Sequence, residues 1–481
     1  MTRLALLPLA AALLVPGATA QTLPELGDPA AAELPPHVER RIGETIVREL
    51  RLRDPAWLDD PEIVEYVSGL GARLAAAAPG ARRDFEFFVV RDTSINAFAL
   101  PGGFIGVHTG LIAASESESE IASVLAHEMA HVTQRHIARL LAAERQAQLP
   151  TLAALAVAIL LGRSRPDLAS GLATAAQGVA VQASLGYSRD FEREADRIGF
   201  QTLAAAGFDV RAMPAFFEKM QRYARLAENP ALPSWLRTHP ITTERIADAQ
   251  GRAASHPYRQ YVDSAEYPLV RAKIRADAGE PGEAVAWFAA LLREGRHASE
   301  AAARYGLAQA RVRSGDAHGA LAEIARLRAA GAASWMVETL EARARAAAGD
   351  AEGALGLLRA ALARYPQRRP VLYATIELLQ QLDRHGEAVA AAAEALRQYP
   401  RDARLHQARA RSFAALGRRL LAHQAQAEYY LLLGSLPAAI EQLELAANAG
   451  DGDFYEQSVV EARLKALRAE HAEELKAARR P

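Results

Sequence analysis

The 481-residue sequence contains no cysteine. Disulfide bonds, a thiol nucleophile and a lipid-modified cysteine at a cleavage site are therefore not expected. Aromatic residues make up only 6% of the chain, and the frequent alanines favour helices. The formal net charge is −1 and no basic stripe with interleaved aromatic residues occurs, so nucleic acid is not an expected partner.

Long hydrophobic runs are also scarce. The first follows Arg3 and leads to an Ala-x-Ala site that ends at Ala20, just before Gln21. It is too short to span a membrane, but the basic start, short apolar segment and small-residue site predict a secretory signal peptide over 1–20. We therefore expect an exported protein that is not a lipoprotein, with a Pro- and Ala-rich linker over 21–36.

A second apolar run extends over 149–162 and continues as an alanine-rich segment to about Ser184. Its length favours a buried helix over a membrane span. We expect a helical hairpin between the helices that carry His127 and Glu192, near the expected cleft of the site. Ordinary packing is favoured over contact with a membrane surface or an unfolded client, and both of these alternatives stay open.

The most informative motif is His127-Glu128-Met129-Ala130-His131. Two histidines four residues apart on a helix lie about 40° apart around its axis, so both imidazoles can reach one metal ion. Glu128 is then placed to take a proton from an activated water. The alternative is an amphipathic helix that carries two histidines by chance.

The helix that carries this motif is well indicated. Ser117-x-x-Glu120 matches a capping box, and no proline or glycine follows before Pro150. On such a continuous helix His136, nine residues after His127, points to the opposite side. We therefore interpret His136 as a surface or packing residue and not as a ligand.

A third ligand is predicted on a second helix, where Glu192 and Asp196 share a face and Glu194 points elsewhere. A carboxylate and two imidazoles make a three-ligand catalytic zinc set with one open position. Asp196 is placed to accept the other ring N–H of a zinc-bound histidine. The alternative is a charged helix face on which Arg193 and Arg197 pair with the carboxylates.

A small sheet is expected next to the motif helix. Residues 37–82 predict two amphipathic helices, and three strands follow, over Phe85–Val90, Ile95–Leu100 and Phe104–His108. We assign the Phe104–His108 strand as the edge that pairs with an extended substrate. An ordinary hairpin that covers the helix is an equal alternative, and His108 is not needed as a ligand.

The C-terminal half contains a repeat. Its turns align on five alanines, spaced by 36 residues and then by 34 residues three times: Ala284, Ala320, Ala354, Ala388 and Ala422. This is the tetratricopeptide period of two helices per repeat. A further turn at Gly434 predicts a run of closing helices to about Ala478. Such an array usually presents a binding surface to a partner, so partner binding is favoured over a role as scaffold alone.

Three separated segments, HEMAHVTQRH, YSRDFEREADRIG and THPITTERI, together resemble family 48 of the metallopeptidases, the HtpX-like peptidases. The order of export signal, peptidase domain and repeat tail is most similar to the periplasmic β-barrel assembly-enhancing type. The resemblance implies one zinc ion per chain, with Glu192 as its third ligand. It also implies that His239 can cap the zinc and hold the enzyme latent, whereas the residues alone show only a His-Pro in a loop.

Together these patterns predict a mostly α fold: a zincin-type α+β metallopeptidase domain over 37–262, followed by an all-α tetratricopeptide solenoid over 265–480. Zinc would be held by His127, His131 and Glu192, and Glu128 would pass a proton from the attacking water to the leaving amine. The candidate donors to the oxyanion are Arg245 and His239.

The resemblance implies a periplasmic zinc endopeptidase that hydrolyses misfolded or stalled outer-membrane and periplasmic proteins. Its repeats would bind clients such as unfolded β-barrel proteins, or the β-barrel assembly machinery. The alternative is a chaperone-like assembly adaptor whose protease site is latent.

Overall fold

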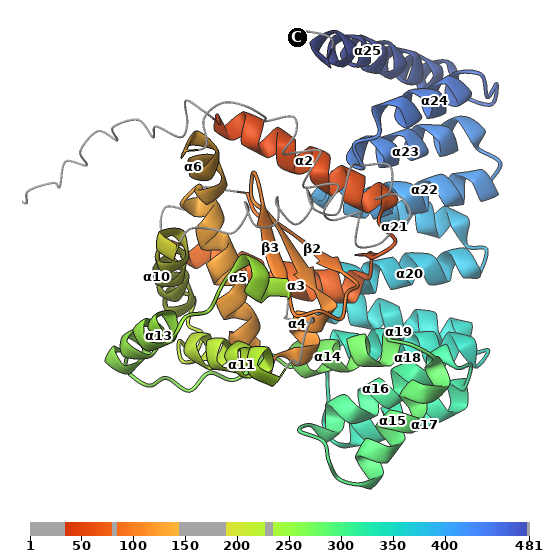
Figure 1. The fold of residues 1–481 in the computed structure, drawn as a ribbon. Helices are drawn as coiled ribbons and strands as arrows, with labels where there is room; N and C mark the ends of the chain where they lie inside the picture. Colours follow the sequence, from red (N-terminus) through yellow and green to blue (C-terminus); the bar gives the residue numbers. More distant parts are fainter. Residues whose placement is uncertain (1–33, 79–83, 144–188, 227–233, 479–481) are drawn as a thin grey trace, which may run out of the picture.

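The computed structural model describes residues 34–78, 84–143, 189–226 and 234–478. A four-stranded sheet lies among the helices of the N-terminal half, and the helix pairs of the C-terminal half curve around one side of it (Figure 1). The predicted architecture, a mostly α protein with a small sheet in its N-terminal half and an all-α tail, is confirmed. The predicted signal peptide and the apolar run over 149–162 lie outside the described residues.

The sheet corrects one assignment made from the sequence. Its strands are β1 (Trp57–Leu58), β2 (Glu86–Val90), β3 (Ala97–Leu100) and β4 (Phe104–His108), in the order β1-β2-β4-β3. β4 pairs with β2 in parallel and with β3 antiparallel, so both of its edges are occupied. The prediction that Phe104–His108 is the edge strand is therefore wrong. The edge nearest the motif helix belongs to β3, which packs against α5 (Glu118–Thr133).

The helices of the N-terminal half lie around α5. They are α2 (Pro36–Arg53), α3 (Pro61–Ala77), α4 (Thr109–Ala114), α6 (His136–Ala143), α10 (Arg189–Ala205), α11 (Ala212–Leu226), α12 (Ser234–Thr238) and α13 (Thr243–Ser255). The Ser117 side chain caps α5 by accepting from the Glu120 backbone N–H at 3.3 Å, as the capping box predicts. α10 can approach α5 closely because residue 199 is a glycine. A Cβ at this position would lie only 3.0 Å from the backbone nitrogen of His127. This contact brings the two helices predicted to carry ligands side by side (Figure 1).

The motif helix ends earlier than predicted. α5 stops at Thr133, Arg135 adopts a left-handed conformation with φ 54°, and α6 begins at His136. The Arg135 side chain is buried and donates to Glu39 Oε2 at 3.3 Å and to the carbonyl of Leu34. These tertiary contacts stabilise a break that no proline or glycine marks. His136 is consequently turned back toward α5.

The C-terminal half consists of antiparallel helix pairs, as the repeat predicts. The helices are α14 (Glu266–Asp277), α15 (Pro281–Arg293), α16 (Glu300–Arg313), α17 (Ala317–Ala329), α18 (Trp335–Ala347), α19 (Ala351–Arg364), α20 (Arg369–Gln381), α21 (His385–Gln398), α22 (Ala403–Ala415), α23 (Arg419–Leu432), α24 (Leu436–Ala447) and α25 (Phe454–Ala478). All five aligned alanines are buried, each near the start of the second helix of a pair. Only a small side chain fits where neighbouring helices cross so closely, which explains the repeat. Within the described ranges, no helix combines the length and apolarity that crossing a bilayer requires.

Ion pairs join the repeats to the N-terminal half. The acidic partners lie at the start of α3 and just before it, and the basic partners lie on α14, α20 and α22. The pairs are Asp60–Lys273 at 3.1 Å, Glu62–Lys273 at 3.4 Å, Glu65–Arg369 at 3.3 Å and Asp59–Arg404 at 2.8 Å. Part of the repeat surface therefore contacts the N-terminal half, as the curved array in Figure 1 illustrates.

Candidate metal centre

Four buried side chains converge from three segments. His127 and His131 lie one turn apart on α5, Glu192 lies on α10, and His239 follows α12. One donor atom from each lies within 4.8 Å of the other three. His127 Nε2 is 3.0 Å from His131 Nε2 and 3.3 Å from His239 Nδ1, and Glu192 Oε1 is 2.9 Å from His239 Nδ1. The structure thus brings together the three residues predicted as ligands and His239, which the resemblance implied as a residue that can cap the zinc.

The spacing and chemistry of these atoms fit a metal ion. Ligands at 2.0–2.2 Å around a tetrahedral centre lie about 3.4 Å apart. The two distances from Glu192 to the motif histidines, Oε2 to His127 Nε2 and Oε1 to His131 Nε2, are both 3.5 Å. Imidazole nitrogens with a carboxylate oxygen are a donor set that suits zinc and several other transition metals.

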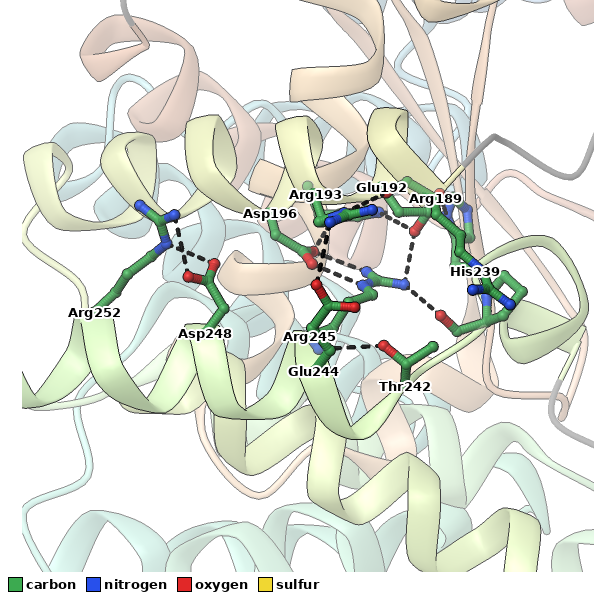
Figure 2. A network of polar contacts seen from close by, with 12 residues as sticks. Arg189, Glu192, Arg193, Asp196, His239, Thr242, Glu244, Arg245, Asp248 and Arg252 are labelled. Atoms are coloured by element: carbon green, nitrogen blue, oxygen red, sulfur yellow. Dashed lines mark hydrogen bonds and ion pairs between the residues drawn. The ribbon is translucent and has the colours of Figure 1, made fainter.

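A second layer of contacts orients these ligands. Asp196 Oδ1 lies 3.0 Å from His127 Nδ1, the ring nitrogen that faces away from the cluster. Arg245, on α13, binds Asp196 through two atoms, with Nε–Oδ2 at 2.7 Å and Nη2–Oδ1 at 2.8 Å. Its third nitrogen, Nη1, lies 2.8 Å from Glu192 Oε2 and donates to the Pro240 carbonyl (Figure 2). The contacts match the position predicted for Asp196, whereas Arg193 pairs with Asp190 and Glu244 on the exposed side.

Arg245 was also a candidate oxyanion donor. Its guanidinium is buried, and the contacts drawn in Figure 2 engage it with two carboxylates and a carbonyl. This geometry favours a positioning role for Arg245 over direct contact with substrate.

Glu128 lies beside the four-residue cluster and is fully buried. One of its oxygens, Oε1, accepts a hydrogen bond from Trp235 Nε1 at 3.1 Å and lies 3.4 Å from His239 Nε2. The other, Oε2, has no hydrogen-bond partner among the described residues. A buried carboxylate oxygen is costly without a partner, so this atom is suited to bind a water or a proton at the site.

The electrostatics favour a cation at this position. Burial opposes protonation of His127, but the Asp196 and Glu192 carboxylates outweigh it and raise the pKa of His127 to about 9. Burial and the nearby His127 ring hold the pKa of His131 well below its usual value. Burial would raise the pKa of Glu192, yet His239 and His127 hold it well below the usual range. The site therefore pairs ionised carboxylates with a bound positive charge, which a metal ion can supply in place of a proton.

His136 is a buried packing residue outside the four-residue cluster, but the prediction that it points to the opposite side of the motif helix is wrong. Because the chain breaks at Arg135, His136 Nδ1 lies 2.8 Å from His131 Nδ1, and the ring is buried. His136 Nε2 lies 3.2 Å from Glu194 Oε2. Glu194 does point away from the cluster, as predicted.

Sequence reasoning missed Trp235 as well as the position of His136. Trp235 stacks on His239 with ring centroids 5.0 Å apart, and its backbone N–H donates to the Ile95 carbonyl at 3.3 Å. The available signal was spacing: Trp235 and His239 are four residues apart and therefore share a face of one helical turn. The His239 backbone N–H indeed donates to the Trp235 carbonyl at 2.8 Å.

Comparisons with known proteins agree with this geometry. Residues 62–253 match the profile of peptidase family M48, and residues 345–412 match a tetratricopeptide repeat. The chain is similar to a putative β-barrel assembly-enhancing protease of Vibrio cholerae, with 41% identity over 269 residues, 56% of this chain and 55% of that protein. It is 38% identical over 256 residues to the β-barrel assembly-enhancing protease of Escherichia coli, covering 53% and 52% of the two chains.

A third relative is more distant. The mitochondrial metalloendopeptidase OMA1 of Danio rerio is 38% identical over 160 residues, which is 33% of each chain. The matches to the two bacterial relatives span only about half the length of those proteins. This chain thus resembles peptidase family M48 over residues 62–253, and a segment that matches a tetratricopeptide repeat follows.

Proposed function

We propose that this protein is a zinc-dependent endopeptidase, with His127, His131 and Glu192 as ligands of one zinc ion per chain. The observation that supports this most directly is the buried four-residue cluster with the unpartnered Glu128 Oε2 beside it. Bound zinc would supply a Lewis acid that polarises the scissile carbonyl and lowers the pKa of a water. The two bacterial relatives carry the name protease, which supports the same activity.

The side chains of the site divide the remaining work. Glu128 takes a proton from the attacking water on Oε2 and returns it to the leaving amine, while the Trp235 N–H fixes its other oxygen. Asp196 accepts the Nδ1 proton of His127 and so directs the Nε2 lone pair of that ring into the cluster. Arg245 holds Asp196 and Glu192 in place.

An extended polypeptide is the substrate class that the surroundings fit. β3 leaves one edge unpaired within the described sheet and packs against α5, so a substrate strand can add to it. A cavity of about 950 Å³ lies where the chain enters β3. Its lining combines Ile95 and Tyr223 of the peptidase half with Ile274 and Arg313 of the repeats. Both halves can therefore contact one client.

We further propose that the protein acts in the periplasm on unfolded or stalled β-barrel proteins, and that the repeats bind these clients or the assembly machinery. The names of the two bacterial relatives and the predicted export signal support this role. We also propose that the peptidase domain extends over 37–262 and the repeat domain over 265–480. α14 begins at Glu266, near the proposed boundary.

A second candidate, an assembly adaptor with a latent protease site, is favoured by the position of His239. Its Nδ1 lies among the ligand atoms, where it would occupy the fourth position. Access of substrate to that position would require α12 and His239 to move away. Both roles can therefore belong to one protein.

Replacing His239 by alanine tests latency. We call the state with His239 at the fourth position closed. If this state is favoured by about 1.4 kcal/mol, roughly one molecule in ten can bind substrate, so the variant should raise kcat/KM on the order of tenfold. The measurement is hydrolysis of an unfolded outer-membrane β-barrel protein by zinc-loaded enzyme. His256→Ala is the matched control, because His256 also precedes a proline after a helix but is exposed and packs on Phe200, outside the four-residue cluster. If zinc-loaded wild type and His239→Ala both leave the client intact, the peptidase proposal fails.

A further inference from the structure

His136 and Glu194 form a hydrogen-bonded chain that ends on His131. The chain runs from Glu194 Oε2 to His136 Nε2 at 3.2 Å, and from His136 Nδ1 to His131 Nδ1 at 2.8 Å. The opposite nitrogen of His131, Nε2, faces the candidate metal centre, 3.0 Å from His127 Nε2. The contacts therefore connect Glu194 to the cluster through the rings of His136 and His131.

The direction of this chain follows from its carboxylate end. An ionised carboxylate only accepts hydrogen bonds, so His136 Nε2 must donate to Glu194. A neutral imidazole then has its lone pair on Nδ1, and His136 Nδ1 accepts from His131 Nδ1–H. His131 in turn has its lone pair on Nε2, which is the atom that faces the cluster. The opposite direction would place a proton on His131 Nε2 and prevent that atom from binding a metal.

We propose that Glu194 and His136 are positioning residues that hold His131 in the tautomer and orientation needed to bind the metal. This deepens the proposed function and rests on it, because it concerns one ligand of that same site. His127 receives the corresponding support from Asp196, at 3.0 Å from its Nδ1. Each motif histidine would then be oriented by a carboxylate, His127 directly and His131 through the imidazole of His136.

Packing fixes the chain in place. The His136 ring stacks on Phe191 with centroids 4.5 Å apart and an angle of 6° between the planes. Arg139 donates to Glu194 Oε2 at 2.8 Å, which keeps that carboxylate ionised and aimed at His136. Phe191 and Glu194 lie on α10, the helix that also supplies Glu192. One helix therefore positions the metal-binding carboxylate and the support for His131 together.

The test compares His136→Phe with wild type in full-length protein. Phenylalanine keeps an aromatic ring against Phe191 but removes the acceptor for His131. Zinc affinity, measured by competition with a chelator, should fall about 10- to 100-fold, as is typical when such supporting groups are removed. Long-range ¹H–¹⁵N couplings in histidine-labelled apoprotein should show His131 as the Nδ1–H tautomer in wild type and as a mixture in the variant.

Two further variants separate positioning from loss of packing. His136→Asn places an amide oxygen near the former Nδ1, so it should recover part of the zinc affinity. His108→Phe removes another buried histidine, which contacts Ser94 Oγ at 2.9 Å, and should leave zinc affinity and the His131 tautomer unchanged.

The outcomes distinguish this inference from the proposed function. If His136→Phe binds zinc as tightly as wild type with the His131 tautomer intact, the positioning role is overturned. Should that variant not fold, Glu194→Ala at the partly exposed end of the chain replaces it, and unchanged affinity and tautomer there overturn the role equally. If wild type shows the expected tautomer and zinc affinity but cleaves no client, the proposed function fails while the positioning role stands.

Discussion

Replacing Glu128 by glutamine is expected to lower kcat/KM for peptide hydrolysis by about 10²- to 10⁴-fold, the usual contribution of a general base and acid. The amide can still accept the hydrogen bond that Trp235 Nε1 donates to Glu128 Oε1. It cannot take a proton from water, which is the role that the buried and unpartnered Oε2 suits among the described residues. The measurement is single-turnover cleavage of an unfolded β-barrel client by zinc-loaded enzyme.

Zinc affinity should remain near that of wild type, because Glu128 is not among the four clustered ligand candidates. Glu118→Gln is the control: Glu118 is a buried glutamate on the same helix that accepts from Ser264 Oγ at 2.6 Å, away from the cluster. It should reduce stability and not the catalytic rate of the folded protein. If Glu128→Gln cleaves at the wild-type rate with zinc bound, the assigned proton transfer is incorrect.

Replacing Arg245 by leucine is expected to destabilise the apoprotein by about 3–5 kcal/mol, the usual cost of removing one partner from a buried ion pair. The variant leaves the carboxylates of Asp196 and Glu192 buried without the guanidinium that contacts both of them. In the wild-type protein the pKa of Asp196 is held below its usual value, because hydrogen bonds from His127 and Arg245 outweigh the effect of burial. The measurement is the free energy of unfolding in denaturant with zinc removed by a chelator.

The same helix supplies a matched control in Arg252, which also binds a carboxylate through two atoms. Its Nε lies 2.8 Å from Asp248 Oδ2, at a distance similar to that in the Arg245 pair (Figure 2). The difference is exposure: 37% for the Arg252 side chain and 4% for Arg245. Arg252→Leu should therefore cost about 1 kcal/mol or less. Equal costs for the two variants would contradict the positioning role assigned to Arg245.

The local part of the site was predictable because helix periodicity fixes it. His127 and His131 are four residues apart, and Glu192 and Asp196 have the same spacing on a second helix. This places each pair on one face wherever the helices form. The repeats were predictable for a similar reason, since a period of 34 residues recurs along the sequence and each aligned alanine is buried.

The features that were wrong or missed depend on contacts between distant segments. The break at Arg135 is stabilised by Glu39 and the Leu34 carbonyl, about a hundred residues earlier in the chain, so no local signal marks it. The order of the strands likewise depends on a long-range contact, because β2 pairs with β4 although β3 lies between them in the sequence. Trp235 reaches Glu128 only because α12 folds back against α5. In each case tertiary packing overrides the local pattern.

The most direct test of the central claim is the zinc content and coordination of the purified protein, measured by elemental analysis and X-ray absorption. We expect one zinc ion per chain with four nitrogen or oxygen ligands from His127, His131, Glu192 and His239, at about 2.0–2.2 Å. His239→Ala should retain the zinc and replace one imidazole by water, whereas His131→Ala should lose it. A protein that carries no zinc after reconstitution, or whose zinc is unaffected by His131→Ala, would contradict the assignment of this cluster as the metal centre.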